Sequence, residues 1–315
     1  MSREVDVVVI GAGLAGLSAA LTSARIGRPT ALVTGGLIGG QLVSIDKIEG
    51  VPGFPDGVPG YDLCPMTQEQ AAAAGVEFVN AAADSLAADG ERWRVTSAEG
   101  ELAARAVVIA TGTALAKLGM PGEERLVGKG VSQCASCDAP LLRGRATVVI
   151  GGGDSGMQEA LTLVEHVAHV VLLERGDALT GQASYRERVS AHPKIELRFG
   201  TVVTEILGDD AVRALRIRDD GGAESELATD AVFAFPGLVP NTNLVRGLAA
   251  LDATGRIAVD AALRTAARGV CAAGNVRESS PHRAAGAMGD GAAAATTLDR
   301  YLASGEWRGP AAGRA

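Results

Sequence analysis

Two stretches of the chain share one pattern of apolar and polar positions. Val5–Ile10 is an almost wholly apolar run that ends at a glycine, and Leu14–Ile26 continues with the longer period of a helix. Thr30–Val33 is a second short apolar run. Apolar runs of this length are typical of parallel strands that are buried on both faces. The pattern therefore predicts a strand, a helix and a second parallel strand.

The same order of elements recurs in the middle of the chain. Here the predicted strand is Thr147–Ile150, the helix is Ser155–Val167 and the second strand is His169–Leu173. The separation of Gly11 from Thr34 equals that of Gly151 from Glu174. Such a repeat predicts an α/β protein with two Rossmann-like nucleotide-binding folds.

Other elements lie between and after these repeats. Glu49–Pro59 is rich in proline and glycine and is expected to be a loop, and Pro121–Gly130 a connection. A long alanine-rich helix is expected over Ala284–Leu302. Further strands are predicted at Arg92–Thr96, Ala106–Ala110, a hairpin within Ala214–Asp230, Phe233–Phe235 and Gly269–Ala273.

Composition narrows the class of protein. The 315 residues suffice for two domains, and the net charge of −8 without a basic stripe argues against a nucleic-acid partner. Val7–Ala24 is apolar over nearly the length of a membrane span, but glycines interrupt it and acidic residues precede it. We therefore expect a buried strand and helix, and a cytoplasmic protein without a membrane segment.

The first repeat carries a glycine turn between its strand and its helix. Gly11, Gly13 and Gly16 form a GxGxxG motif. The first glycine makes the turn, the second admits a pyrophosphate and the third lets the helix approach the strand. The alternative is a tight turn without a ligand, which the flanking strands make less favourable.

The second repeat carries the same turn at Gly151, Gly153 and Gly156, with Asp154 and Ser155 between the last two. Glu174 ends the following strand, where a carboxylate can bind the hydroxyls of a ribose and repel a 2′-phosphate. This favours NADH over NADPH, although Arg175 could hold that phosphate. The alternative is that Glu174 is only a solvated strand end.

Cys134 and Cys137 form a Cys-x-x-Cys pair directly before Asp138. Such a pair can open and close as a disulfide, and the adjacent carboxylate can hold a proton. Zinc would need a second close pair of ligands, which the isolated Cys64 and Cys271 do not provide, so we expect no metal. Two inert thiols are the other alternative. Cys64 and Cys271 are expected to pack as small apolar residues.

As an ordered set, these motifs resemble the bacterial low-molecular-weight thioredoxin reductases over nearly the whole chain. The resemblance also includes Thr34-Gly35, Gly39-Gly40-Gln41-Leu42, Pro52-Gly53-Phe54-Pro55, Ala110-Thr111-Gly112, Pro240-Asn241-Thr242 and Ala272-Ala273-Gly274.

The resemblance implies FAD on the first fold and NAD(P)H on the second. The FAD domain would be discontinuous, residues 1–115 and 240–315. The NAD(P)H domain, residues 116–239, would be inserted into it and carry the Cys-x-x-Cys pair, and both domains would be Rossmann-like with a three-layer ββα arrangement. A homodimer is also implied. Cys137 would face the flavin, Cys134 would attack the substrate disulfide and Asp138 would donate a proton. The implied FAD contacts are Gly11, Gly13, Gly16, Thr34, Gly40, Gln41, Gly112, Gly274, Asn275, Arg283 and Ala284.

The chain departs from the family in both nucleotide sites. One arginine, Arg175, remains of the set that holds the 2′-phosphate, so this site is closer to the NADH-using flavoprotein subunit of alkyl hydroperoxide reductase. Asn275 replaces an aspartate, and the Arg-Gln-Ala motif is Arg283-Ala284-Ala285. These differences concern cofactor contacts, while the sulfur pair keeps the family pattern.

We therefore expect a flavoprotein that passes electrons from NAD(P)H through FAD and Cys134–Cys137 to a thioredoxin-like or glutaredoxin-like protein or a small disulfide. One alternative is a dithiol oxidase that forms a disulfide in a small molecule and reduces oxygen. Another is a redox sensor or an electron-delivery subunit that needs a partner.

Overall fold

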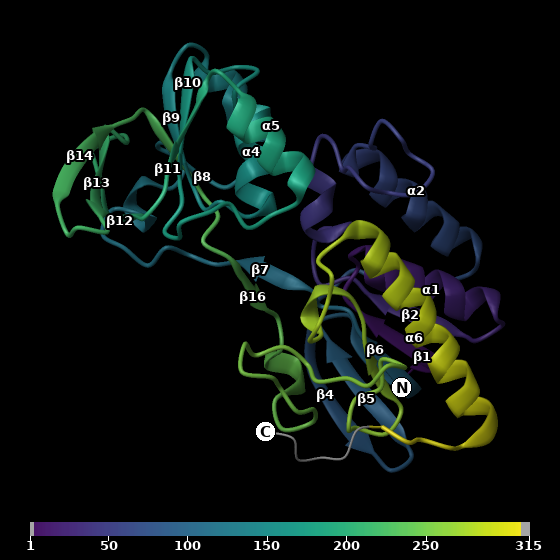
Figure 1. The fold of residues 1–315 in the computed structure, drawn as a ribbon. Helices are drawn as coiled ribbons and strands as arrows, with labels where there is room; N and C mark the ends of the chain where they lie inside the picture. The colour runs from purple at the N-terminus through teal and green to yellow at the C-terminus, as the bar shows by residue number, and fades with distance from the viewer. Residues whose placement is uncertain (1–2, 310–315) are drawn as a thin grey trace. The chain divides into compact units, whose positions relative to one another are not determined.

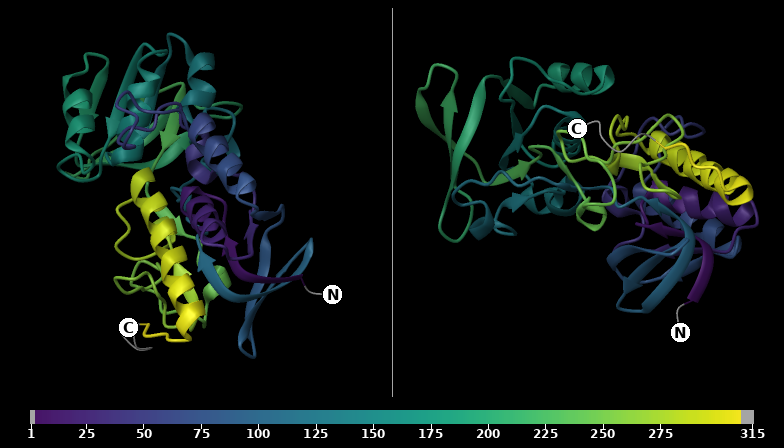
Figure 2. Two further views of the ribbon diagram at one scale, coloured as in Figure 1. Left: turned by 90° about the vertical axis from the view of Figure 1, so that its right-hand side faces the viewer. Right: turned by 90° about the horizontal axis from the view of Figure 1, so that it is seen from below.

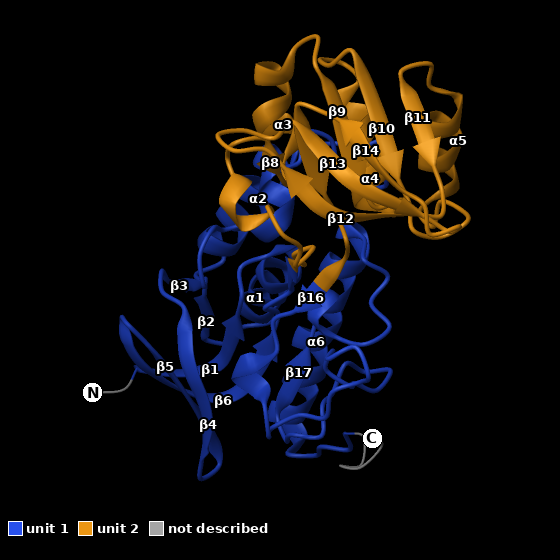
Figure 3. Ribbon diagram, turned by 90° about the vertical axis from the view of Figure 1, so that its left-hand side faces the viewer, with its two compact units in different colours: residues 1–114, 239–315 blue, residues 115–238 orange. Residues whose placement is uncertain are grey.

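The computed structural model describes residues 3–309, which divide into two compact units (Figure 3). Unit 1 takes residues 1–114 and 239–315, and unit 2 takes residues 115–238. The chain therefore leaves unit 1 once and returns once. The two connecting strands, β7 (Thr113–Leu115) and β16 (Leu238–Pro240), pair with each other. Just beyond them, the N–H of Ala116 donates to the carbonyl of Gly237 at 2.9 Å.

Unit 1 is built on a seven-stranded sheet in the order β3-β2-β1-β6-β5-β4, with β17 beside the end of β6 (Figures 1 and 3). β1, β2, β3, β6 and β17 are parallel, whereas β4 and β5 extend the sheet in antiparallel fashion. The bounds are β1 Arg3–Ile10, β2 Thr30–Val33, β3 Glu77–Val79, β4 Ala83–Asp89, β5 Arg92–Ser97, β6 Gly100–Ile109 and β17 Val270–Ala272.

Alternate residues of β1 enter two different cores. Val7 and Val9 pack with Leu17 of helix α1 (Leu14–Arg25) and Leu298 of helix α6 (Ala284–Ser304). Val8 and Ile10 join the opposite core, which includes Trp93 and Val95 of β5. This alternation follows from the two-residue period of a strand. It places helices α1 and α6 on one face of the sheet, while the core on the other face includes Trp93 and Val95 of the antiparallel extension.

Helices α1 and α6 run side by side because their facing residues are small (Figure 2). A Cβ at Gly291 would lie 2.2 Å from the carbonyl oxygen of Ala15. A larger residue at this contact would force the helices apart. Helix α2 spans Gly60–Ala73.

Unit 2 has three layers around a parallel sheet in the order β11-β10-β9-β15-β8. Val149, Leu172 and Phe233 pack on the helix side, and Val148, Val171 and Val232 pack on an antiparallel sheet, β12-β13-β14. The strands are β8 Val131–Ser132, β9 Ala146–Ile150, β10 His169–Leu173, β11 Ile195–Arg198, β12 Thr201–Leu207, β13 Ala214–Asp219, β14 Glu224–Ala228 and β15 Ala231–Ala234. The helices are α3 Ala135–Asp138, α4 Asp154–Leu163 and α5 Ala183–Ala191.

Short 3₁₀ helices occur in both units. They span Gly40–Ser44, Glu124–Leu126, Ala139–Leu142, Asn243–Val245 and Gly274–Val276. No helix among residues 3–309 is long and apolar enough to cross a membrane.

The repeated strand–helix–strand pattern is confirmed in both units, with small shifts of the boundaries. Helix α4 ends at Leu163 and not at Val167, because the chain turns there toward β10. The strand expected at Phe233–Phe235 is β15, Ala231–Ala234. The connection Pro121–Gly130 contains a short 3₁₀ helix, and the hairpin within Ala214–Asp230 is confirmed as β13 and β14.

Candidate active site

The first glycine turn leaves an open space against β1 and α1. A Cβ at Gly11, whose φ is 104°, would lie 2.4 Å from the carbonyl oxygen of Ala110. A Cβ at Gly16 would lie 1.8 Å from the carbonyl oxygen of Gly11, but a Cβ at Gly13 would meet nothing within 4 Å. Gly11 and Gly16 are therefore required by the packing of the backbone, whereas Gly13 leaves room for a ligand.

The second turn has nearly the same contacts. A Cβ at Gly151, whose φ is 111°, would lie 2.4 Å from the carbonyl oxygen of Phe235, and one at Gly156 would lie 1.9 Å from that of Gly151. At Gly153 the nearest atom would be the Thr180 hydroxyl, 3.9 Å away. Each unit thus has the close approaches and the single gap that a dinucleotide pyrophosphate requires.

A loop closes over the gap of unit 1. The N–H of Gly39 donates to the carbonyl of Ala12 at 2.8 Å, and a Cβ at Gly40 would lie 3.5 Å from Cα of Gly13. Gln41 donates to the carbonyl of Thr113. Thr34, at the end of β2, is buried. The loop and the glycine turn form a cradle lined by backbone, which fits the pyrophosphate of FAD.

The segment after β17 offers an unpaired donor. The side-chain oxygen of Asn275 accepts from the hydroxyl of Ser280 at 3.1 Å, but its amide nitrogen has no partner among residues 3–309. This half-buried amide can donate to a hydroxyl of a ribityl chain, whereas an aspartate at this position would accept from it. Arg283 is the N-cap of α6, and Ala284 is its first residue. Gly112, between β6 and β7, has open space around it.

An ion pair that sequence reasoning missed supports this segment. Arg277 donates to both carboxylate oxygens of Asp290, at 2.7 and 2.8 Å. The same carboxylate accepts from the N–H of Gly274 at 2.9 Å. Both side chains are nearly buried, 13% and 11% exposed. The pair fixes the backbone that carries Asn275.

The carboxylate of Glu174 lies on the second glycine turn. One oxygen accepts from the N–H of Gly152 at 2.6 Å, and the other accepts from the N–H of Gly176 at 2.8 Å. Arg175 is exposed, as is Ser155. Asp154 accepts from the N–H of Gln182 at 2.7 Å and so ties the start of α4 to the loop before α5.

Cys134 and Cys137 are joined by a disulfide, with an S–S distance of 2.10 Å. Cys134 is the N-cap of α3, and its sulfur accepts from the N–H of Cys137 at 3.2 Å. Cys137 is exposed, whereas Cys134 and Asp138 are partly buried. A thiolate formed on Cys134 would still accept this N–H, and the hydrogen bond would lower the free energy needed to ionise the thiol.

The other two cysteines lie in apolar cores. Cys64 and Cys271 are both fully buried, and burial raises the pKa of the Cys64 thiol to about 11. The pKa of Cys271 is also raised, first by burial and then by the neighbouring Asp260. Their expected role as small apolar residues is confirmed.

A second missed residue lies beneath the disulfide. Glu159 of α4 is 7% exposed, and its carboxylate accepts from the N–H of Ala135 at 2.5 Å. Nothing in the sequence links these positions, because they lie in different elements of the fold.

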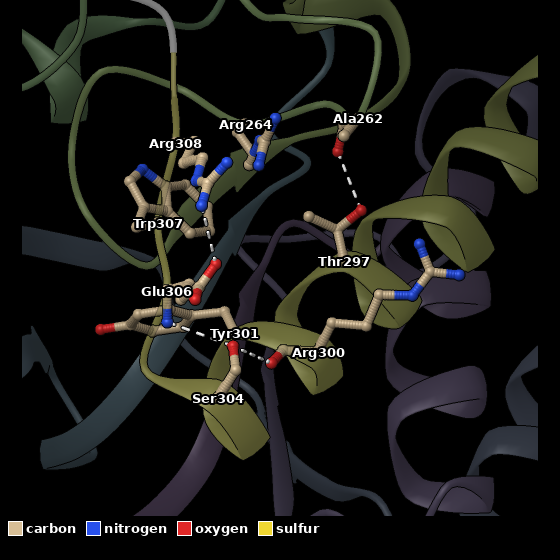
Figure 4. A pocket seen from close by; sticks show the side chains of 9 residues that line it. All are labelled: Ala262, Arg264, Thr297, Arg300, Tyr301, Ser304, Glu306, Trp307 and Arg308. Carbon is tan, nitrogen blue, oxygen red and sulfur yellow. Dashed lines mark hydrogen bonds and ion pairs between the residues drawn. The ribbon is translucent and has the colours of Figure 1, made fainter.

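One pocket of unit 1 lies away from these residues. It has a volume of about 290 Å³ and is lined at the C-terminal end of α6 by Arg300, Tyr301 and Trp307 (Figure 4). The predicted FAD contacts on α6 lie at its other end, near Ala284. No sequence-predicted site residue lines this pocket.

Comparisons with known proteins show which family this chain belongs to. Residues 5–291 match the sequence profile of the pyridine nucleotide-disulphide oxidoreductases. Thioredoxin reductase from Treponema pallidum is 36% identical over 303 residues, which cover 96% of this chain and 98% of that protein. The crystal structure of thioredoxin reductase from Lactococcus lactis superposes with a TM-score of 0.92 at 33% identity, covering 95% and 99% of the two chains. The crystal structure of thioredoxin reductase from T. acidophilum superposes with a TM-score of 0.91 at 32% identity, covering 96% of this chain and 100% of that one.

Proposed function

The chain belongs to the pyridine nucleotide-disulphide oxidoreductases and, among them, to the thioredoxin reductases, and from this premise we propose that NADH is its preferred electron donor. It is an FAD-dependent NAD(P)H disulfide oxidoreductase, and Cys134–Cys137 is its redox-active disulfide. The choice between the two nucleotides depends on the pocket at the end of β10.

Glu174 carries the proposal. Its carboxylate is bound to two backbone N–H groups, so it cannot swing away without losing both hydrogen bonds. A ribose at this turn would present its hydroxyls to that carboxylate, and a 2′-phosphate there would meet a like charge. Gly176 and Thr180 provide no cation to offset this repulsion, and Arg175 provides one on an exposed side chain. The pocket therefore favours NADH, as in the flavoprotein subunit of alkyl hydroperoxide reductase.

The glycine cradle of unit 1, with Gln41 and Asn275, would hold FAD. The chemistry that FAD supplies when bound is transfer of an electron pair from the reduced nicotinamide to the disulfide. In this chain the residues around the disulfide handle the protons. Asp138 follows Cys137 directly and is half-buried, so it can donate a proton to a leaving thiolate.

The two sulfurs differ in access. Cys137 is exposed, whereas Cys134 is partly buried and its sulfur accepts the N–H of Cys137. Exposure of the closed disulfide does not set the order of attack. We propose, as the family resemblance implies, that Cys134 attacks the outside disulfide while Cys137 faces the flavin, because the N–H of Cys137 stabilises a thiolate on Cys134. In C137S the mixed disulfide should accumulate on Cys134, as mass spectrometry would detect. Accumulation on Cys137 in C134S, with none on Cys134 in C137S, would contradict this assignment.

The substrate would be a thioredoxin-like or glutaredoxin-like protein, or a small disulfide, reduced in the cytoplasm by a homodimer. The named activity of the relatives supports a thioredoxin. The complete glycine turn of unit 2 supports a nicotinamide-driven reductase over a dithiol oxidase, which has no need of this turn.

An anaerobic titration of the FAD-loaded protein tests the nucleotide preference. Flavin absorbance at increasing NADH or NADPH reports reduction directly, without a protein substrate. We expect NADH to bleach the flavin at a concentration at least about tenfold lower than NADPH. Equal or better reduction by NADPH would contradict the proposal.

A further inference from the structure

A buried carboxylate lies next to the redox-active disulfide. Glu159 projects from α4 toward the first turn of α3, where it accepts from the N–H of Ala135 at 2.5 Å. The residue is 7% exposed, and its neighbours along α4, Met157 and Ala160, are fully buried apolar residues. A buried carboxylate interacts with nearby charges more strongly than an exposed one, because little water screens it.

The reacting sulfur is one residue away from this contact. Ala135 follows Cys134, so a negative charge on Glu159 lies close to any thiolate on Cys134. Charged groups on α3 and on the elements in closest contact with it include Asp138 on α3 itself, Asp154 at the start of α4 and the exposed Arg143 after the 3₁₀ helix.

We propose that Glu159 is a positioning residue that makes the dithiol of Cys134 and Cys137 a stronger reductant. It holds the start of α3 through Ala135, and its charge opposes the thiolate of Cys134. A like charge disfavours the ionised thiol, so the reduced state is less stable and gives up its electrons more readily. Asp138 and Glu159 thus have separate roles, since the first is placed to move a proton and the second acts through a fixed charge.

The charge of Glu159 influences a thiol–disulfide exchange in which the two cysteines supply all the electrons and protons. The dithiol transfers two electrons and two protons to an outside disulfide, whose S–S bond breaks to give two thiols. The Cys134–Cys137 bond forms in the same exchange. Dithiothreitol can drive the reverse reaction, reducing the protein while it closes to its own cyclic disulfide. The test below uses this reagent, so it does not depend on the preference for NADH.

Glu159→Gln tests the proposal in the FAD-loaded protein. Glutamine has nearly the same volume and keeps an oxygen that can accept from Ala135, but it carries no charge. In a C137S background, the pH dependence of alkylation by iodoacetamide gives the pKa of Cys134. We expect E159Q to lower this pKa by about one unit.

The second measurement is the equilibrium of the intact pair with reduced and oxidised dithiothreitol. We expect E159Q to shift it toward the dithiol by up to about tenfold near pH 8.5, which corresponds to about 30 mV for two electrons. The shift should shrink near pH 6.5, where the thiols are protonated with either residue at position 159. Glu165→Gln, which removes an exposed carboxylate after the end of α4, should leave both quantities unchanged.

An unchanged alkylation pKa and an unchanged dithiothreitol equilibrium in E159Q would overturn the proposal. If these two quantities changed in E159A but not in E159Q, the role of Glu159 would be purely structural, which would overturn it as well. Should E159Q fail to retain its fold, Glu159→Asp replaces it, because aspartate keeps the charge and shortens the side chain. The proposal predicts that E159D keeps the pKa of Cys134 within about half a unit of the parent. A larger fall in this variant would contradict it.

Discussion

Asp290 binds the guanidinium of Arg277 through both of its carboxylate oxygens, at 2.7 and 2.8 Å. The same carboxylate accepts the N–H of Gly274, so one nearly buried ion pair holds the segment that presents Asn275. Loss of one partner would leave the other charge buried and the segment unsupported.

We expect Asp290→Asn to lower the free energy of unfolding by about 3 kcal/mol, because it leaves Arg277 without its counter-charge. Retention of FAD should fall as well. Thermal unfolding with and without added FAD measures both effects. Glu306→Gln breaks an exposed pair with Arg308 and serves as the control, since such pairs contribute at most about 1 kcal/mol. Equal melting temperatures for the two variants would contradict this prediction.

The glycine turns allow cofactor binding to be separated from folding. In the protein without FAD, Gly13→Ala should fold with nearly unchanged stability, because a Cβ there meets nothing within 4 Å. It should nevertheless bind FAD poorly, because the methyl group enters the gap. Gly16→Ala should lose at least about 2 kcal/mol of stability, since its Cβ would lie 1.8 Å from a carbonyl oxygen. Circular dichroism melts and flavin content measure the two effects, and normal FAD content in G13A would be the contrary result.

Glu174→Gln should weaken the discrimination between NADH and NADPH. The variant removes the negative charge that a 2′-phosphate would meet, and a like-charge interaction of about 1.4 kcal/mol after screening corresponds to about tenfold in relative kcat/KM. Steady-state kinetics with both nucleotides give the ratio. Asp177→Asn removes an exposed carboxylate from the same loop and should change the ratio less than about threefold. A similar change of the NADH-to-NADPH ratio in both variants would show that Glu174 does not set the preference.

After reduction, the native protein should offer two reactive thiols. Raised pKa values keep Cys64 and Cys271 protonated near pH 8, because each thiol ionises only when the pH approaches its pKa. Iodoacetamide followed by peptide mass spectrometry should label Cys134 and Cys137 and leave the other two unmodified. In denaturant all four should react. Labelling of Cys64 in the native protein at the rate of Cys137 would show that its core opens readily.

The strand–helix–strand repeat could be predicted because strands buried on both faces are continuously apolar. Helix α5 could not, because its nine residues bury only Tyr185 and Val189. Helix α2 carries Pro65 in its interior and only a weak apolar face, and the sequence offered no clear period there.

The glycines of the candidate site were predictable because each meets a local requirement of the turn. The supporting carboxylates were not. Glu159 bonds to a residue in another element, and Asp290 pairs across the start of α6, so neither contact follows from a local pattern. Long-range partners of this kind depend on how the elements pack, which a single sequence does not reveal.

The pairing of β7 with β16 brings the two ends of unit 2 together, and Ala116 bonds to Gly237 directly beyond the pair. Because the two ends of unit 2 lie next to each other, removing it would leave a gap in unit 1 that a short turn can bridge. A gene encoding residues 1–114 joined by a short turn to residues 239–315 would then encode a flavin-binding module without its partner domain. The paired strands β7 and β16 thus make unit 2 an insertion that enters and leaves its host at one place.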